Sequence, residues 1–302
     1  MISKSELSES RVLVIGDVML DKWSYHEQTR ISPEAPVPII KEKSSFYEIG
    51  GAGNALRHLD ALTGRNNRLI TVIGDDDIGG KACKVIEAAN YSVNYEILKS
   101  RRTTLKDRFF LDNQLVFRID TEEVTDIPLE TEASLMATLN AEMKNFDVIL
   151  ISDYAKGVLT QNLVHKIIVL SRAQNIPVVT DPGFGRLAIY RGCTAIKPNA
   201  AEWNQFVNSV GNEKKGLKDL FDHGTKYVLI TQGASGVRLI TQDFEISLKP
   251  ERDVRVVDVT GAGDSVAAAL SLLVGSGHSV SENLQLLNNI GAETVQKAKT
   301  QL

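Results

Sequence analysis

Short apolar runs alternate along the chain with longer segments in which apolar residues recur every three or four positions. Runs of about five residues rich in Val, Ile and Leu are typical of strands buried on both faces of a parallel sheet. The longer segments have the period of amphipathic helices. We therefore expect an α/β fold with helices on both faces of a mainly parallel sheet. The expected strands are 11–15, 69–73, 148–152, 177–180 and 227–231, and the expected helices are 53–62, 79–90, 130–144, 161–174, 261–274 and one from the capping box at Ser279.

Two stretches, 23–49 and about 92–122, interrupt this alternation because they look like strands without a helical period. We expect them to form a small separate sheet, a lid on a single domain that spans 1–302. In the second stretch Lys106 and Arg108 are separated by one residue, so a strand would place both cations on one face. Such a face over a cleft suits a phosphorylated substrate. An edge strand that charge protects from aggregation has the same pattern.

Composition excludes several classes of protein. The 302 residues are 43% hydrophobic and 24% charged, as in ordinary globular α/β proteins, and the net charge of −4 argues against partners such as nucleic acid or an anionic membrane surface. The two cysteines and five histidines lack metal-ligand spacing. The N-terminus has no apolar signal core, and no stretch of eighteen apolar residues occurs. These features predict a reduced, cytoplasmic protein.

The main candidate for chemistry is the string Gly261-Ala262-Gly263-Asp264, which precedes a strongly apolar helical run. Backbone N–H groups in the first turn of a helix attract negative charge, and glycines let a phosphoryl group approach closely. Asp264 beside them could accept the proton of an alcohol. The string therefore predicts in-line phosphoryl transfer to a hydroxyl, with Asp264 as base and the loop amides as an anion hole. Taken alone, it also fits a glycine turn with an N-capping Asp.

Two glycine-rich strings do not fit the nucleotide motifs that they superficially resemble. Gly74–Ala82 lacks the spacing of a P-loop, and Ala82 stands where a magnesium-binding hydroxyl is needed. Gly50–Asn54 lacks the dinucleotide pattern and follows the lid-like stretch instead of opening a βαβ unit.

Several motifs together resemble the ribokinase-like carbohydrate kinase family in identity and order, over nearly the whole chain. More narrowly, four strings are similar to the D-glycero-D-manno-heptose-7-phosphate kinase branch, and Arg30–Pro38 is the most specific of them. The family motifs are Gly16-Asp17, Gly50-Gly51-x-x-Asn54, Pro198-Asn199-x-x-Glu202, Thr231-x-Gly233-x-x-Gly236 and Asp258-x-Thr260-Gly-Ala-Gly-Asp264, and the branch strings are Gly16–Asp21, Arg30–Pro38, Ser152–Gly157 and Tyr190–Gly192.

The resemblance implies a three-layer αβα sandwich with a mainly parallel central sheet and a small β-sheet lid. In this family the lid is often the surface through which two copies form a homodimer. It also implies an ATP-dependent kinase that phosphorylates the anomeric hydroxyl of a heptose 7-phosphate, on the route to the heptose of lipopolysaccharide. The implied cofactors are ATP and Mg²⁺, and a monovalent-cation site stays open.

The resemblance also assigns site residues. Carboxylates and amides suit sugar hydroxyls, and glycines let backbone approach the ring. Asn199 and Glu202 lie one helical turn apart and could both face the triphosphate and hydrated magnesium, although the same pair fits an Asn-capped helix start. The expected sugar-phosphate ligands are Asp17, Gly50, Gly51, Asn54, Lys106, Arg108 and Asp153, and the expected nucleotide ligands are Asn199, Glu202, Thr231, Gly233, Gly236, Asp258 and Asn288.

The chain departs from the heptose kinases at two positions. They usually have Asp-Pro-Lys-Gly where this chain has Gly183 after Asp181-Pro182, and they commonly have threonine at the position of Lys197. Either Lys197 or Arg186 could replace the lost charge, or the substrate could differ. Two alternatives therefore stay open: a kinase for another sugar phosphate, and a silent sugar-phosphate or nucleotide sensor. The intact Asp264 argues against the sensor.

Overall fold

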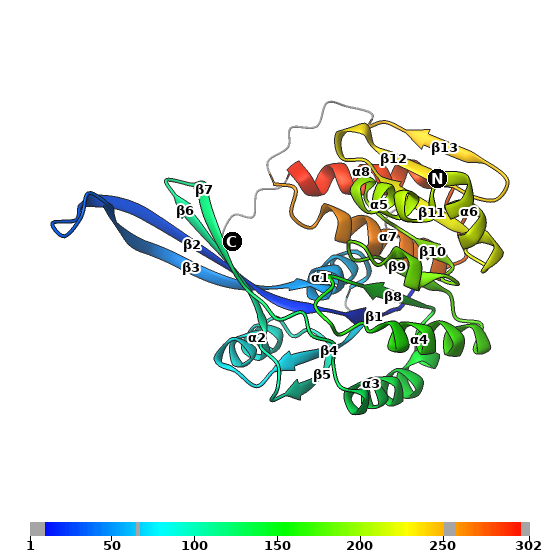
Figure 1. Ribbon diagram of the computed structural model, residues 1–302, viewed down its shortest axis with the longest axis horizontal. Coiled ribbons are helices and arrows are strands. Elements are labelled where there is room, and N and C mark those ends of the chain that lie inside the picture. The colour runs from blue at the N-terminus through cyan, green and yellow to red at the C-terminus, as the bar shows by residue number, and fades with distance from the viewer. Residues whose placement is uncertain (1–9, 65–66, 251–257, 297–302) are drawn as a thin grey trace.

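The computed structural model describes residues 10–64, 67–250 and 258–296. Within them, a large sheet has the strand order β13-β12-β11-β10-β9-β8-β1-β4-β5 (Figure 1). All its pairs are parallel except those of β12 and β13 at one edge. The strands are β1 (Val12–Gly16), β4 (Arg68–Gly74), β5 (Val93–Leu98), β8 (Val148–Ser152), β9 (Val178–Asp181), β10 (Ala195–Ile196), β11 (Tyr227–Thr231), β12 (Val237–Ile240) and β13 (Glu245–Leu248).

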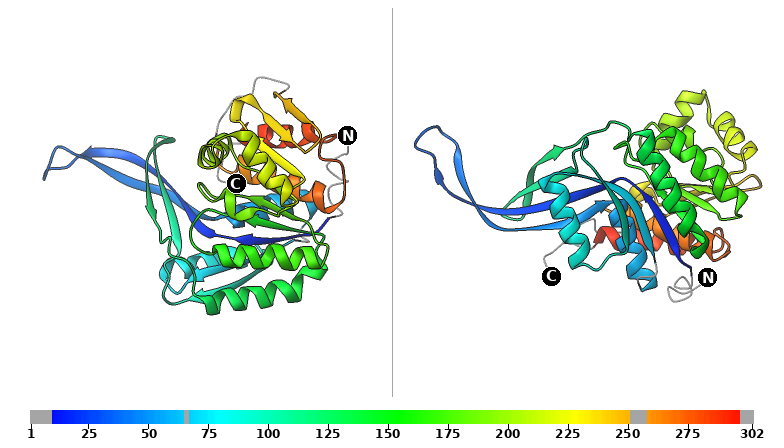
Figure 2. Two further views of the ribbon diagram at one scale, coloured as in Figure 1. Left: turned by 45° about the vertical axis from the view of Figure 1, so that its right-hand side comes forward. Right: turned by 90° about the horizontal axis from the view of Figure 1, so that it is seen from below.

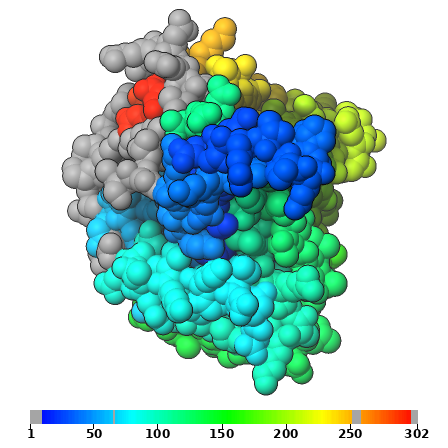
Figure 3. Space-filling view, turned by 90° about the vertical axis from the view of Figure 1, so that its left-hand side faces the viewer, coloured from blue at the N-terminus to red at the C-terminus, as the bar shows by residue number. Residues whose placement is uncertain are grey.

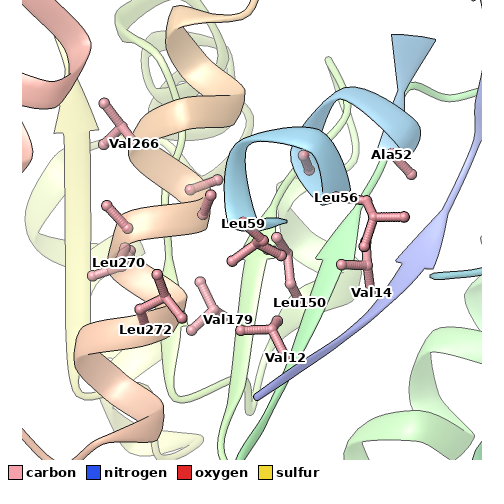
Figure 4. Close-up of a cluster of buried hydrophobic side chains, with 14 of the residues drawn as sticks. Val12, Val14, Ala52, Leu56, Leu59, Leu150, Val179, Val266, Leu270 and Leu272 are labelled. Carbon is pink, nitrogen blue, oxygen red and sulfur yellow. The ribbon is translucent and has the colours of Figure 1, made fainter. Parts of the chain in front are cut away.

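Helices cover both faces of this sheet, so the expected three-layer αβα sandwich is confirmed. Alternate residues of β1 point to opposite cores: Val12 and Val14 pack towards α1 and α7, and Leu13 and Ile15 pack in the second core with α3 and α4. Figure 4 shows the first core, where α1 and α7 lie over the strands. The helices are α1 (Ala52–Thr63), α2 (Asp77–Ala88), α3 (Leu129–Glu142), α4 (Gln161–Ala173), α5 (Ala200–Val210), α6 (Glu213–Asp222), α7 (Ala262–Gly275) and α8 (Leu284–Gln296).

A second sheet of four strands has the order β3-β2-β6-β7 and matches the predicted small sheet. Its strands are β2 (Val18–Ile31), β3 (Pro38–Gly51), β6 (Thr104–Leu111) and β7 (Gln114–Thr121). The β2–β3 hairpin extends far from the body in Figures 1 and 2, and Figure 3 views it from its tip. The second lid segment is shorter than the predicted 92–122, because β5 pairs with β4 in the large sheet.

The five expected strands and the expected helices up to 274 agree with the structure to within a few residues. The last helix begins at Leu284, not at Ser279, although the amide of Glu282 donates to the Ser279 hydroxyl at 3.3 Å, as in a cap. Helix α6 was not among the expected elements, and of α5 only a helix start at Asn199 was considered. Among the described residues, no helix is long and apolar enough to cross a membrane.

Candidate active site

A cavity of about 1270 Å³ lies where the parallel strands of the large sheet end. Its walls include residues directly after β8, β9, β10 and β11, together with the first turn of α7. The carboxyl ends of parallel strands are where open α/β sheets bind ligands. Eleven predicted site residues line it: Asp153, Asn199, Glu202, Thr231, Gly233, Gly236, Gly261, Ala262, Gly263, Asp264 and Asn288.

The predicted anion hole lies in the first turn of α7, beside the cavity. Gly261 precedes the helix with φ of 83°, a left-handed conformation that favours glycine. A Cβ on Gly261 would lie 2.5 Å from Nδ2 of Asn54, so a side chain there would displace the amide. Ala262 and Gly263 line the cavity, and N–H groups at the start of a helix have no partner within the helix. The amide of Ala262 donates to the carbonyl oxygen of Val259, which precedes the helix, at 3.4 Å.

Both carboxylate oxygens of Asp264 have a donor. Nδ2 of Asn54, from α1, donates to Oδ2, and the hydroxyl of Tyr154, from the loop after β8, donates to Oδ1. Asp264 is buried yet lines the cavity. Three segments far apart in sequence therefore meet at the predicted base, and Asn54 contacts its carboxylate directly.

Asp17 does not line the cavity. Its buried carboxylate accepts hydrogen bonds from the backbone N–H groups of Tyr154, Lys156 and Val158 at 2.9, 3.1 and 3.0 Å. Burial, with the neighbouring charge of Asp153, raises the pKa of Asp17 to about 6 although the three amides oppose this. Asp17 holds the loop 154–158 in place, a role that differs from the expected contact with sugar hydroxyls.

Asp21, which ends the string Gly16–Asp21, was not among the expected ligands. It lies in β2 of the small sheet. Its Oδ1 accepts a hydrogen bond from Arg108 at 2.8 Å, and its Oδ2 lies against Gly50, where an added Cβ would approach to 2.4 Å. Gly51 has φ of 62°, and its Cβ would meet the carbonyl oxygen of Asp17 at 2.3 Å. The glycine pair thus permits close packing between β2, β3 and the start of α1.

Lys106 and Arg108 lie on one face of β6 as expected, but their surroundings differ. Arg108 is buried in the ion pair with Asp21 and stacks over the ring of Trp23 at 4.7 Å. Lys106 forms no ion pair within the described part of the chain, and its Nζ lies 5.9 Å from the centre of the Tyr154 ring. Lys106 is therefore the better placed of the two cations to bind an anionic group.

Asp153 is already compensated by neighbouring donors. Its carboxylate accepts hydrogen bonds from Nε of Arg186 at 2.6 Å, from the hydroxyl of Tyr190 and from the backbone of Ala155 at 2.7 Å. A Cβ on Gly183 would lie 3.0 Å from Cγ of Asp153. Arg186 is therefore engaged by Asp153 and is poorly placed to replace a phosphate-binding charge.

Lys197 is the buried cation of the cavity wall. Its Nζ lies 2.9 Å from Oδ1 of Asp181, and a Cβ on Gly263 would lie 3.4 Å from this ammonium. Although burial alone lowers it, the pKa of Lys197 is raised, because Asp181, Glu202 and Asp264 surround the ammonium with negative charge. The ammonium therefore stays charged beside the first turn of α7.

Asn199 and Glu202 form a capping box at the start of α5. Oδ1 of Asn199 accepts from the backbone of Glu202 at 3.0 Å, and Oε2 of Glu202 accepts from the backbone of Asn199 at 2.8 Å. The helix-start interpretation of this pair is thus correct, and both residues also line the cavity. The other oxygen of Glu202 takes no part in the box, and burial raises the pKa of this carboxyl. Such an oxygen on the cavity wall suits a hydrated Mg²⁺, which prefers carboxylates and retained waters.

Four of the five remaining predicted nucleotide ligands line the cavity, and Asp258 does not. Thr231 ends β11, and Gly233 and Gly236 form the turn into β12, so this segment is both a hairpin turn and part of the wall. Asn288 of α8 lines the cavity and donates to the carbonyl of Lys249 at 3.0 Å. Asp258 caps its own turn, accepting from the backbone of Thr260 at 2.8 Å, and does not line the cavity.

The family model described as pfkB family carbohydrate kinase matches residues 9–302. The chain belongs to this family. It is therefore an ATP-dependent carbohydrate kinase, as the site with Asp264 and the anion hole at α7 suggests.

Curated relatives carry the name bifunctional protein HldE. The chain is 37% identical to the one from Campylobacter jejuni over 292 residues and 33% identical to one from Haemophilus influenzae over 300 residues. These matches cover 95% and 98% of this chain but 61% and 62% of the relatives. The chain thus spans about three fifths of their length.

Solved structures show the same fold at low identity. Phosphofructokinase-2 from Escherichia coli in complex with potassium superposes with a TM-score of 0.76 at 19% identity, covering 97% of this chain and 95% of that one. Arabidopsis thaliana ribokinase complexed with ribose and ATP gives 0.68 at 17% identity, covering 96% and 94%. Both likenesses confirm the ribokinase-like sandwich.

Proposed function

We propose that this kinase transfers the γ-phosphoryl group of ATP to the anomeric hydroxyl of D-glycero-D-manno-heptose 7-phosphate, forming the 1,7-bisphosphate that leads to ADP-heptose and the lipopolysaccharide core. The main support is the match to the relatives named HldE, which extends over 95% of the chain. The strings 30–38 and 152–157, which resemble the heptose kinase branch, lie in the hairpin and in the cavity loop.

In this proposal the chain supplies the base and the electrostatic environment of the transfer. Asp264 accepts the proton of the attacking hydroxyl while that oxygen bonds to the γ-phosphorus and the bond to the β–γ bridging oxygen breaks, releasing ADP. In this proposal the amides of Ala262 and Gly263, which line the cavity, and the ammonium of Lys197 beside Gly263 stabilise the charge that develops on the phosphoryl oxygens.

In this proposal the nucleotide binds along the cavity wall formed by Thr231, Gly233, Gly236 and Asn288. Asn199 and Glu202 would hold hydrated Mg²⁺, which neutralises charge on the phosphates when bound. The proposal does not include the monovalent-cation site that the resemblance left open.

We propose that the sugar phosphate binds between Asp264 and the small sheet, with Lys106 as the phosphate-binding cation. Asp21, Asn54 and the 50–51 glycine pair border this region. Arg108 and Asp153 would support it indirectly, since both are engaged by partners of opposite charge.

A panel of sugar phosphates tests the proposal by mass spectrometry of the ATP-dependent products. Heptose 7-phosphate should give a bisphosphate with kcat/KM well above that of fructose 6-phosphate or ribose 5-phosphate. Preference for another sugar phosphate would support the kinase activity but show that heptose 7-phosphate is not the substrate. Absence of any ATP-dependent product would favour the silent sensor.

We also propose a homodimer formed through the small sheet. Large apolar side chains on this sheet and its hairpin turn are about half exposed, and exposed apolar patches mark contact surfaces. They are Ile31, Val37, Ile40, Leu115, Val116, Phe117 and Ile119.

A further inference from the structure

We infer that Tyr154 is a positioning residue for Asp264, an assignment that rests on the proposed function and deepens it. The hydroxyl of Tyr154 donates to Oδ1 of Asp264, while Asn54 donates to Oδ2. A carboxylate held at both oxygens by donors from different elements has its torsion angle fixed. Each oxygen keeps a second lone pair, so the acceptor hydroxyl can still bind.

Tyr154 is itself held firmly, which a positioning role requires. The loop that carries it is gripped by Asp17, whose carboxylate accepts from the amides of residues 154, 156 and 158. Ala155 has φ of 54°, a strained conformation for a non-glycine residue, and its amide donates to Asp153. Such strain persists only where surrounding contacts determine the backbone.

The phenol also acts reliably as a donor. Burial, together with the charges of Asp264 and Asp181, raises the pKa of Tyr154 well above its usual value, so the hydroxyl keeps its proton. Across the ring lies Nζ of Lys106, at 5.9 Å from the ring centre. Tyr154 thus stands between the cation of the lid strand β6 and the base, and it connects the substrate-binding sheet with the reacting group.

Tyr154 is therefore a third contributor to phosphoryl transfer, besides the proposed base and the proposed anion hole. Tyr154 does not exchange protons with the substrate. It keeps Asp264 aimed at the incoming hydroxyl, and a misplacement of about 1 Å at a reacting group can cost roughly 10²-fold in rate.

The test is Tyr154→Phe, which removes one oxygen and keeps the ring under Lys106. We expect kcat to fall roughly 10²-fold while KM for ATP and for the sugar phosphate stays within about threefold, because alignment is lost and binding is kept. The matched control is Tyr47→Phe, whose hydroxyl interacts with Lys81 away from the cavity and whose loss should leave kcat unchanged.

Crystal structures of the wild type and of Tyr154→Phe provide a measurement that needs no turnover. We expect the Asp264 carboxylate to rotate or to occupy two orientations in the variant. A single unchanged orientation, or kcat within about twofold of the wild type, would overturn the inference. If the wild type transfers no phosphate to heptose 7-phosphate, the proposed substrate fails, and the orientation of Asp264 still decides the role of Tyr154.

Discussion

The ammonium of Lys197 lies 2.9 Å from Asp181 and is buried within the wall of the active-site cavity. It also lies beside Gly263, in the first turn of α7. A buried cation at this point adds to the positive end of the helix, so in the proposed reaction both would stabilise charge on the phosphoryl oxygens.

Replacing Lys197→Thr should therefore reduce kcat/KM by roughly 10²-fold or more, since removal of one transition-state donor commonly costs that much. The double variant with Gly183→Lys should recover much of the activity, because the new ammonium would enter the same cavity from the neighbouring loop. A double-mutant cycle on kcat/KM measures the coupling. Additive effects, or no recovery, would mean that the two positions have separate roles and that Gly183 marks a changed substrate.

Asp264→Asn should lower kcat by roughly 10²–10⁴-fold, because the substitution removes the base and keeps its shape. ATP affinity, measured by calorimetry, should change little. Turnover within a few-fold of the wild type would remove Asp264 from the mechanism.

Lys106→Ala should raise KM for a sugar phosphate far more than KM for the same sugar without its phosphate, since Lys106 forms no ion pair in the described part of the chain. Steady-state kinetics with both substrates measure the difference. Equal effects on the two substrates would show that Lys106 does not bind the phosphate.

Arg108→Ala should act mainly on stability. It leaves the buried carboxylate of Asp21 without its partner at 2.8 Å, and breaking a buried ion pair costs about 3–5 kcal/mol. Urea unfolding measures the loss. An unchanged unfolding free energy together with a raised KM would instead return Arg108 to the substrate site.

Asp17 makes stability depend on pH with a defined sign. Its folded-state pKa of about 6 lies above the ordinary 3.8, so the folded protein binds the proton more tightly than the unfolded chain does. The resulting stabilisation is full below pH about 4 and is lost as pH rises through about 6. The wild type should therefore lose about 2–3 kcal/mol relative to Asp17→Asn between pH 4 and pH 7.5, measured by urea unfolding. A difference that stays constant with pH would show that Asp17 remains ionised throughout.

Charge placed on the apolar small sheet should separate the proposed dimer. Phe117→Asp puts a carboxylate on a half-exposed aromatic position of β7, next to Leu115 and Ile119 on this strand. We expect sedimentation to give a dimer for the wild type and a monomer for the variant. Val169→Asp, at an exposed apolar site on α4, is the control that should remain dimeric. A wild-type monomer would contradict the proposal.

The sequence predicted the sandwich well because its buried strands are continuous apolar runs, as β1 and β8 are. The sequence was less informative for strands whose place in a sheet depends on the strand with which they pair. Strand β5 was assigned to the lid because its half-buried edge position leaves no alternation that distinguishes the two sheets. Strand β10, with two residues, is too short for any periodic signal.

The site shows the same division. Asp264 and its glycines form a contiguous string, so their chemistry could be predicted from sequence. Asp17 and Asp21 lie four residues apart, and the sequence does not distinguish their roles. In the structure Asp17 holds the loop 154–158, whereas Asp21 lies in the small sheet, where β2 pairs with β6 and Arg108 donates to its carboxylate. Tyr154 lies within the string Ser152–Gly157 that resembles the heptose kinase branch, but the string does not indicate its role, which depends on a contact with a residue 110 positions away.

The connection between the large sheet and the small sheet is very short. Strand β1 ends at Gly16 and β2 begins at Val18, so one residue separates the core of the sandwich from the lid. Side chains alternate between the faces of a strand, and a shift of one residue therefore exchanges the two faces. Deleting a residue between Val18 and Leu20 would turn Asp21 and Trp23 away from Arg108. Substitutions at this junction should thus be tolerated better than insertions or deletions. In contrast, the exposed turn at 32–37 can lengthen without moving the active site.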